Sequence, residues 1–175
     1  MKFIKRAVCI LCFLNCSPVY AKNAETDKIQ VLNVMKKYIQ TIACQLEENK
    51  SKKIINMTTN LDDTDVYYVL WWGDVGCAGG VATITANITE VRKNKWMDLN
   101  YNVSVNPVIE EEIYYNLNPR YIEDLKRISE NKIEIVSSDY SQASSRFPDR
   151  KYRYIFQRSE SGAKWNVVNK ILITK

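Results

Sequence analysis

The first 21 residues constrain the fold most, because they determine the redox compartment in which the rest of the chain folds. Three basic residues open this segment, an apolar run follows over residues 7–14, and the triplet Val19-Tyr20-Ala21 ends it. This order is typical of a cleaved secretory signal peptide. We therefore predict that residues 1–21 are removed and that residues 22–175 form one exported domain. An uncleaved N-terminal anchor and a lipid attached to Cys16 are the alternatives.

Export in turn determines the expected state of the cysteines. Cys44 and Cys77 are the two of the five cysteines that lie outside residues 1–21. Paired cysteines in an oxidising compartment form disulfides, so we predict one bridge between them. A pair of free thiols, one of them reactive, is the alternative. Two cysteines without any histidine do not make an ordinary zinc site, and we predict neither a metal nor a cofactor.

The net charge argues against nucleic acid as the partner. The whole chain carries a formal charge of +5. Residues 1–21 contain three basic residues and no acidic residue, so their removal lowers the charge from +5 to +2. A strongly basic binding surface is not expected at that charge. After residue 21, no apolar segment is long enough to cross a bilayer, so we expect no integral membrane segment in the mature protein.

The spacing of apolar residues predicts one long helix followed by strands. Apolar residues recur at three- and four-residue steps from residue 29 to about residue 48, which predicts an amphipathic helix. Strands are predicted over residues 66–72, 81–91, 96–105 and 133–136, with a final hairpin of residues 152–158 and 164–173.

A second helix is predicted between the third and fourth of these strands. Asn118 is a favourable N-cap and Pro119 a favourable first helical residue. The apolar stripe that follows contains Tyr121, Ile122, Leu125 and Ile128. The sum is an α+β fold, with a long N-terminal helix packed on one curved antiparallel sheet of five or six strands and a short second helix. This plan resembles cystatin-like or NTF2-like architectures, a likeness that carries no function.

The residue types limit the available chemistry. The chain has no histidine, so it lacks the base of Ser-His-Asp and Cys-His pairs. We therefore predict no catalytic residues and no enzymatic activity. The alternative is a glycan-active enzyme that uses carboxylates alone, with two acidic residues about 5–10 Å apart in a pocket.

Two regions are candidate partner-binding sites. In the first, a glycine-rich turn presents Trp71, Trp72 and Asp74 to a partner; in the alternative, the tryptophans belong to the core and the glycines permit a tight turn. The second region is basic and interleaved with aromatic residues, and it could grip an acidic protein, or it is an ordinary solvated strand face. Its candidate residues are Arg146, Arg150, Lys151 and Arg153.

The segment of residues 42–80 resembles a pattern found in small exported proteins of Gram-negative bacteria. In these proteins a helix ends in Ala-Cys-x-Leu-Glu, and a strand ends near Trp-x-Gly-Asp-x-Gly-Cys-Ala-Gly-Gly. The matching residues are Ala43, Cys44, Leu46, Glu47, Trp71, Gly73, Asp74, Gly76, Cys77, Ala78, Gly79 and Gly80. The resemblance covers less than a quarter of the chain. It implies paired cysteines and bacterial export, and no particular activity.

These observations favour a binding protein of the periplasm or the extracellular space. In its most concrete form it is an immunity or inhibitor protein that blocks a toxin or hydrolase by protein–protein contact. The expected partner is therefore another protein. The main alternative is an accessory component of a secretion, conjugation or adhesion apparatus.

Overall fold

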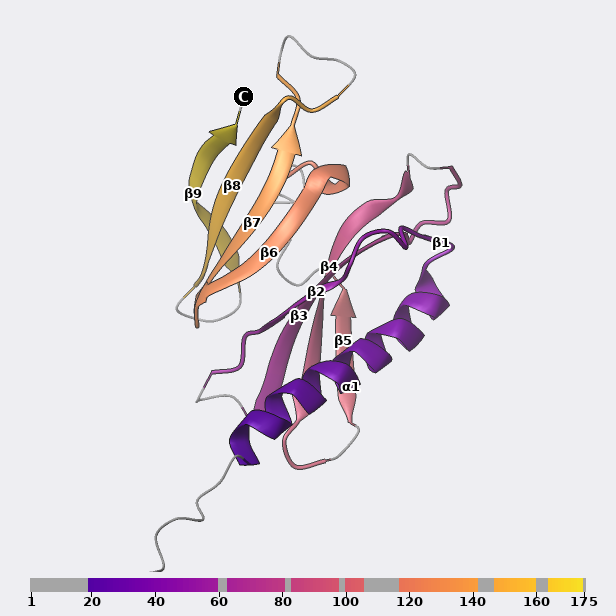
Figure 1. Cartoon of the computed structure of the whole chain (residues 1–175), viewed down its shortest axis with the longest axis vertical. Helices are drawn as coiled ribbons and strands as arrows, with labels where there is room; N and C mark the ends of the chain where they lie inside the picture. Colours follow the sequence, from indigo (N-terminus) through magenta and orange to yellow (C-terminus); the bar gives the residue numbers. More distant parts are fainter. Residues whose placement is uncertain are drawn as a thin grey trace, which may run out of the picture.

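A computed structural model of the chain describes residues 19–59, 63–80, 83–97, 100–105, 117–141, 147–159 and 164–174, with side chains from residue 25 onward. These residues form a helix and two antiparallel sheets stacked in three layers (Figure 1). The first layer is helix α1 (Val19–Ile42). Sheet A contains β1 (Gln45–Leu46), β2 (Lys53–Asn56), β3 (Thr64–Asp74), β4 (Thr85–Asn94) and β5 (Tyr101–Val105). Sheet B contains β6 (Ile122–Ser129), β7 (Lys132–Asp139), β8 (Arg150–Arg158) and β9 (Trp165–Thr174).

Strand β3 is the centre of sheet A. It pairs with β4 along ten positions, from Thr64 opposite Asn94 to Gly73 opposite Thr85. On its other side it pairs with β2 and, nearer its end, with β1. Nine consecutive residues, Val66–Asp74, are buried, because the layers on both sides of the sheet cover this strand.

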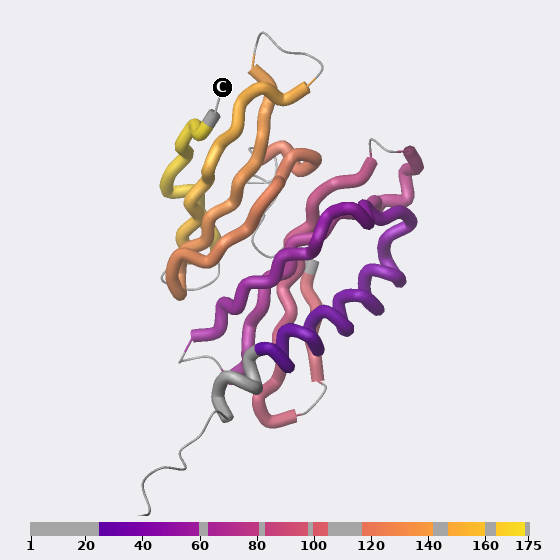
Figure 2. The backbone as a smooth tube through the Cα atoms, in the orientation of Figure 1, coloured from indigo at the N-terminus to yellow at the C-terminus, as the bar shows by residue number. Residues whose placement is uncertain are grey.

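The side chains of β3 alternate between two separate cores. Tyr67, Val69 and Trp71 pack against the helix residues Val31, Met35 and Ile39. The intervening residues point to sheet B, where they join a larger core. That core contains Tyr68, Leu70 and Trp72 of β3 with Ile122, Leu125, Ile133, Ile135, Tyr154, Phe156 and Trp165 of sheet B. The tube in Figure 2 shows α1 lying along sheet A as a layer distinct from the strands of sheet B.

Sheet B is a meander of four strands in sequence order, β6-β7-β8-β9. Its inner face packs on sheet A, and Trp165 at the start of β9 forms part of that contact. The Trp165 indole donates a hydrogen bond of 3.1 Å to the Tyr68 hydroxyl, and the two rings meet edge to face. Burial is the main reason that the pKa of Tyr68 is raised to about 12, and its hydroxyl oxygen accepts the bond from the indole.

The predicted class, α+β, agrees with this structure, but the prediction of a single sheet of five or six strands is wrong. The strands divide into two sheets that face each other. The strand segments themselves were largely predicted, and the final hairpin is β8–β9. The predicted strand 96–105 is observed only from Tyr101 to Val105 among the described residues.

The predicted second helix is also wrong, and a β-bulge explains the error. Asn118 caps only one turn of 3-10 helix, Pro119–Tyr121, and strand β6 begins directly after it. The pairing of β6 with β7 shifts register between Ile122 and Asp124. The extra residue places Ile122 and Leu125 on the same buried face although they are three positions apart, which imitates helical spacing. The fourth residue of the predicted stripe, Ile128, is exposed.

The first helix ends earlier than predicted. Its last helical hydrogen bond runs from the Ala43 N–H to the Ile39 carbonyl, and the next N–H, that of Cys44, binds the Asp74 carbonyl of β3. The apolar period beyond Ile42 therefore belongs to strand β1. Within the described residues, no helix is long and apolar enough to span a bilayer.

Candidate functional site

The structure joins Cys44 and Cys77 in a disulfide, with their Cα atoms 5.3 Å apart. Cys44 follows helix α1, and Cys77 lies in the glycine-rich turn between β3 and β4. The predicted pairing is therefore confirmed, and the bridge connects the helix layer to sheet A.

Asp74 organizes the glycine-rich turn from inside. Its side chain is buried, and its carboxylate accepts hydrogen bonds from the Gly79 N–H at 3.1 Å and the Thr83 hydroxyl at 2.9 Å. Burial raises the pKa of Asp74, but these two hydrogen bonds and those from the N–H groups of Ala78 and Cys77 outweigh burial and hold the pKa below its usual value. The carboxylate therefore binds the protein's own turn.

The backbone of this turn has left-handed residues that explain its composition. Gly79 and Gly80 have φ values of 78° and 98°, which glycine adopts without strain. Cys77 has a φ of 52° and is held there by the disulfide and by its hydrogen bond to Asp74. The glycines are therefore explained by the turn geometry.

The two predicted tryptophans lie in the two cores. Trp71 is 1% exposed and its indole donates to the Thr89 hydroxyl at 2.8 Å. Trp72 is 5% exposed and donates to the Ile122 carbonyl of sheet B at 3.1 Å. A side chain at Gly73 would meet the Trp71 ring at 2.7 Å, so glycine is required for this packing. Both indoles are therefore buried and hydrogen-bonded inside the protein.

A groove of about 430 Å³ lies between helix α1 and the segment that follows β1. Its apolar lining includes Leu32, Ile39 and Leu46, and Trp71 and Trp72 reach it from β3. Lys50 lies over the Trp72 ring, 5.1 Å from its centre. The rim carries charges of both signs, from Lys36, Glu47, Glu48, Lys50 and Lys52. With three lysines and two glutamates, the rim has a mixed charge with a small positive excess.

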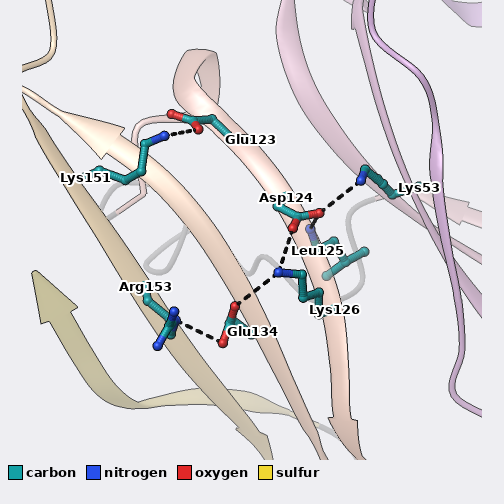
Figure 3. A network of polar contacts seen from close by, with 8 residues as sticks. All are labelled: Lys53, Glu123, Asp124, Leu125, Lys126, Glu134, Lys151 and Arg153. Atoms are coloured by element: carbon teal, nitrogen blue, oxygen red, sulfur yellow. Dashed lines mark hydrogen bonds and ion pairs between the residues drawn. The ribbon is translucent and has the colours of Figure 1, made fainter. Parts of the chain in front are cut away.

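The predicted basic residues of β8 lie on sheet B in an ordered ionic network (Figure 3). Lys151 pairs with Glu123 of β6 at 2.6 Å. Arg153 Nε lies 3.1 Å from a Glu134 carboxylate oxygen of β7, an ion pair without hydrogen-bond geometry. Arg150 is exposed at the start of the strand, and Arg146 lies outside the described residues. The structure therefore brings Arg150, Lys151 and Arg153 together on one strand.

The network continues across sheet B toward sheet A. Lys126 of β6 reaches Glu134 at 3.9 Å and Asp124 at 3.1 Å, and Asp124 reaches Lys53 of β2 at 3.5 Å (Figure 3). Burial raises the pKa of Glu123, but hydrogen bonds from Lys151 and Ser138 outweigh it and lower the pKa below its usual value. The Glu123 carboxylate is therefore ionised at neutral pH and holds Lys151 in place.

The sequence predicts the strand next to these cations but does not mark it as a candidate binding site. Strand β9 exposes five large apolar side chains, each between 39% and 54% exposed: Val167, Val168, Ile171, Leu172 and Ile173. The unbroken run Ile171-Leu172-Ile173 is the signal in the sequence, because a strand buried on one face alternates instead. Its exposure follows from the place of β9 at the end of the sheet, which the sequence pattern does not reveal.

The hairpin of β8 and β9 is therefore both cationic and apolar. With Lys164, which immediately precedes β9, the two strands carry six basic residues and no acidic residue. These are Arg150, Lys151, Arg153, Arg158, Lys164 and Lys170. Among the described residues, no group of three His, Cys, Asp or Glu side chains is arranged to hold a metal ion.

No protein-family model, no curated protein and no solved structure matches this sequence. The functional argument therefore depends on the surface chemistry of the described residues.

Proposed function

We propose that this protein is an exported binding protein, most concretely a periplasmic immunity or inhibitor protein that blocks a toxin or hydrolase by protein–protein contact. The observation that carries the proposal is the β8–β9 hairpin, where cations on β8 adjoin exposed apolar side chains on β9. Exposed apolar clusters rimmed by polar groups are typical of protein contact surfaces.

The two components of this surface support different parts of binding. Cations on the rim steer an acidic partner and select it against basic ones. Apolar side chains supply the favourable burial, about 25 cal/mol for each Å² removed from water. The disulfide and the export signal fit a protein that works in an oxidising compartment.

The ion pairs of Lys151 and Arg153 favour recognition by a pre-ordered surface. Glu123 and Glu134 hold these two side chains on the sheet in the unbound protein. These two side chains then lose less conformational entropy when a partner binds, because they are already positioned.

The proposal is tested with the full sequence expressed for export, so that the processed protein serves as bait in envelope extracts. A variant with Arg150→Gln, Lys151→Gln and Arg153→Gln is compared with a control that carries Lys28→Gln, Lys36→Gln and Lys37→Gln on α1. We expect a protein that wild type and control retain and the β8 variant loses, and whose enzymatic or toxic activity the wild type inhibits.

Two outcomes contradict the proposal. One is a retained protein whose activity is the same with and without the bound wild type. The other is co-fractionation of the protein with a large envelope assembly, which favours an accessory component of a secretion or adhesion apparatus.

A further inference from the structure

We propose that the outer edge of β9 binds an extended acidic segment of the partner, which adds to sheet B as a fifth, neighbouring strand. This inference deepens the proposed function and rests on it. Strand addition of this kind obtains affinity from backbone hydrogen bonds and specificity from the side chains beside them.

The backbone of β9 is available on one side. Eight of its ten residues pair with β8, and within the described part of the chain no strand pairs with its other edge. At the start of the ladder the Ser159 N–H donates to the Lys164 carbonyl at 2.7 Å, so the polar groups of residue 164 point toward β8. Since direction alternates along a strand, those of Trp165 and Val167 point away from β8, toward the free edge.

The side chains of this edge are unusually apolar for an exposed strand. Trp165 fixes the start of β9 in the core, but Val167, Val168, Ile171 and Leu172 are at least 39% exposed. Natural proteins usually protect such edges with a charge, a bulge or a covering segment. Strand β9 has two register shifts, one between the pairs of Ile155 and Phe156 and one between those of Lys151 and Tyr152, and it has one lysine, Lys170.

Charge identifies the occupant. The described residues 150–158 and 164–174 carry six basic residues and no acidic residue, and the described residues of 117–174 as a whole carry ten basic against six acidic residues. Pairing of β9 with β9 of a second copy would bring two such hairpins together, and like charges that face each other across strands destabilise the pair. The same cations attract an acidic strand.

Position on the sheet adds to the charge argument. Arg153 lies directly opposite Ile171, and Lys151 opposite Thr174, so these cations flank the C-terminal half of β9. Lys170, also in that half, lies over the Tyr152 ring at 4.2 Å. An added strand would lie on the other side of β9 from β8. Acidic residues on one of its faces would be separated from Arg153 and Lys151 by the width of β9, within reach of long side chains.

The first experiment measures binding of labelled peptides to the exported protein by fluorescence anisotropy. The probe is a ten-residue peptide of alternating Glu and Val, matched in length to β9. We expect it to bind at least about tenfold more tightly than the corresponding peptide of Lys and Val, and more weakly as salt rises. Equal affinity for the two peptides would overturn the proposal.

The second experiment separates strand addition from simple attraction of a polyanion. The same Glu-Val peptide, N-methylated at alternate residues, keeps its charges but loses the N–H groups needed for pairing. We expect its affinity to fall at least about tenfold. Undiminished binding would show that charge alone acts, and would overturn strand addition without any change to the protein.

The third experiment changes the edge itself. Val167→Pro removes an outward N–H, and Val75→Pro offers a control outside any strand. We expect folded Val167→Pro, checked by circular dichroism, to lose Glu-Val binding while the control retains it. A wild-type dimer in sedimentation that Val167→Pro dissociates would overturn the proposal in favour of a second copy.

The same variant distinguishes this inference from the proposed function. A protein partner that binds Val167→Pro as well as wild type overturns the edge site and leaves inhibition by the β8 cations standing. Peptide binding that Val167→Pro abolishes, in a protein that inhibits no retained partner, supports the edge site and contradicts the inhibitor function.

Discussion

Strands β3 and β9 are similar in length and apolar content but lie in different environments. Both are long, with 11 and 10 residues, and both are rich in large apolar side chains. Helix α1 and sheet B cover the two faces of β3, and strands pair with both of its edges. Among the described residues, strand β9 has one neighbouring strand and five large apolar side chains that remain exposed. Composition therefore does not separate a buried strand from an exposed one; the position in the sheet does.

The strongest test of this comparison uses the same substitution in both strands. Leu70→Ala in β3 removes a fully buried side chain and should lower the free energy of unfolding by about 3–5 kcal/mol, because a cavity remains. Leu172→Ala in β9, where the side chain is 40% exposed, should cost less than about 1 kcal/mol. Urea unfolding measures both. Equal costs would mean that the two strands are buried alike and would remove the basis for a contact role of β9.

The second largest expected effect concerns the disulfide, which connects the helix layer to sheet A and does not connect either of them to sheet B. Cys44→Ser should lower the free energy of unfolding by roughly 2–4 kcal/mol, since the loop of 33 positions is no longer closed in the unfolded chain. Hydrogen exchange should show the larger loss of protection in α1 and smaller changes in β7 and β8.

Reduction of the wild type by dithiothreitol is the control for this variant. It should reproduce the loss, and it should leave Cys44→Ser unaffected. A variant as stable as the oxidised wild type would contradict the bridge.

The smallest expected effect depends on pH. The pKa of Asp74 is lower in the folded protein than its ordinary value of 3.8, so its stabilising contribution is complete above that value and is lost as pH falls through the folded pKa. Asp74→Asn should therefore be less stable than wild type at pH 7, and this difference should shrink below about pH 4.

Asp149, which immediately precedes β8 of sheet B, is the matched control for Asp74. Hydrogen bonds from Ser141 lower its pKa too, but Asp149 is exposed and solvent screens its charge. Urea midpoints of Asp149→Asn should follow those of wild type more closely at every pH. A larger pH dependence for Asp149→Asn than for Asp74→Asn would contradict the interior role of Asp74.

Much of the fold follows from local patterns. The buried run at residues 66–72 and the alternating strands around it predicted most of the strand segments, and the cysteine count predicted the bridge. The helix at residue 118 was predicted wrongly because a bulge at Ile122 gives a strand the three-residue spacing of a helix. The division into two sheets was missed because pairing order is a long-range property that spacing does not encode.

The candidate site was predicted in part for the same reason. The basic residues of β8 were identified, since their charges are visible in the sequence. Their partners Glu123 and Glu134 lie on neighbouring strands and become evident only from the register. The exposed edge of β9 becomes evident only from the strand order, whereas the burial of Trp71 and Trp72 matches the alternative interpretation of the glycine-rich segment.

The alternation of β3 between two cores has a consequence for the order in which the chain matures. Sheet A ends at Val105, and all of sheet B lies after it in the sequence. A chain made from its N-terminus can therefore pack Tyr67, Val69 and Trp71 against the helix first. At that stage Tyr68, Leu70 and Trp72 are still exposed, because sheet B has not yet been made. Until the last seventy or so residues have been added, the incomplete chain exposes this largely aromatic face, and a chaperone in the same compartment would bind there.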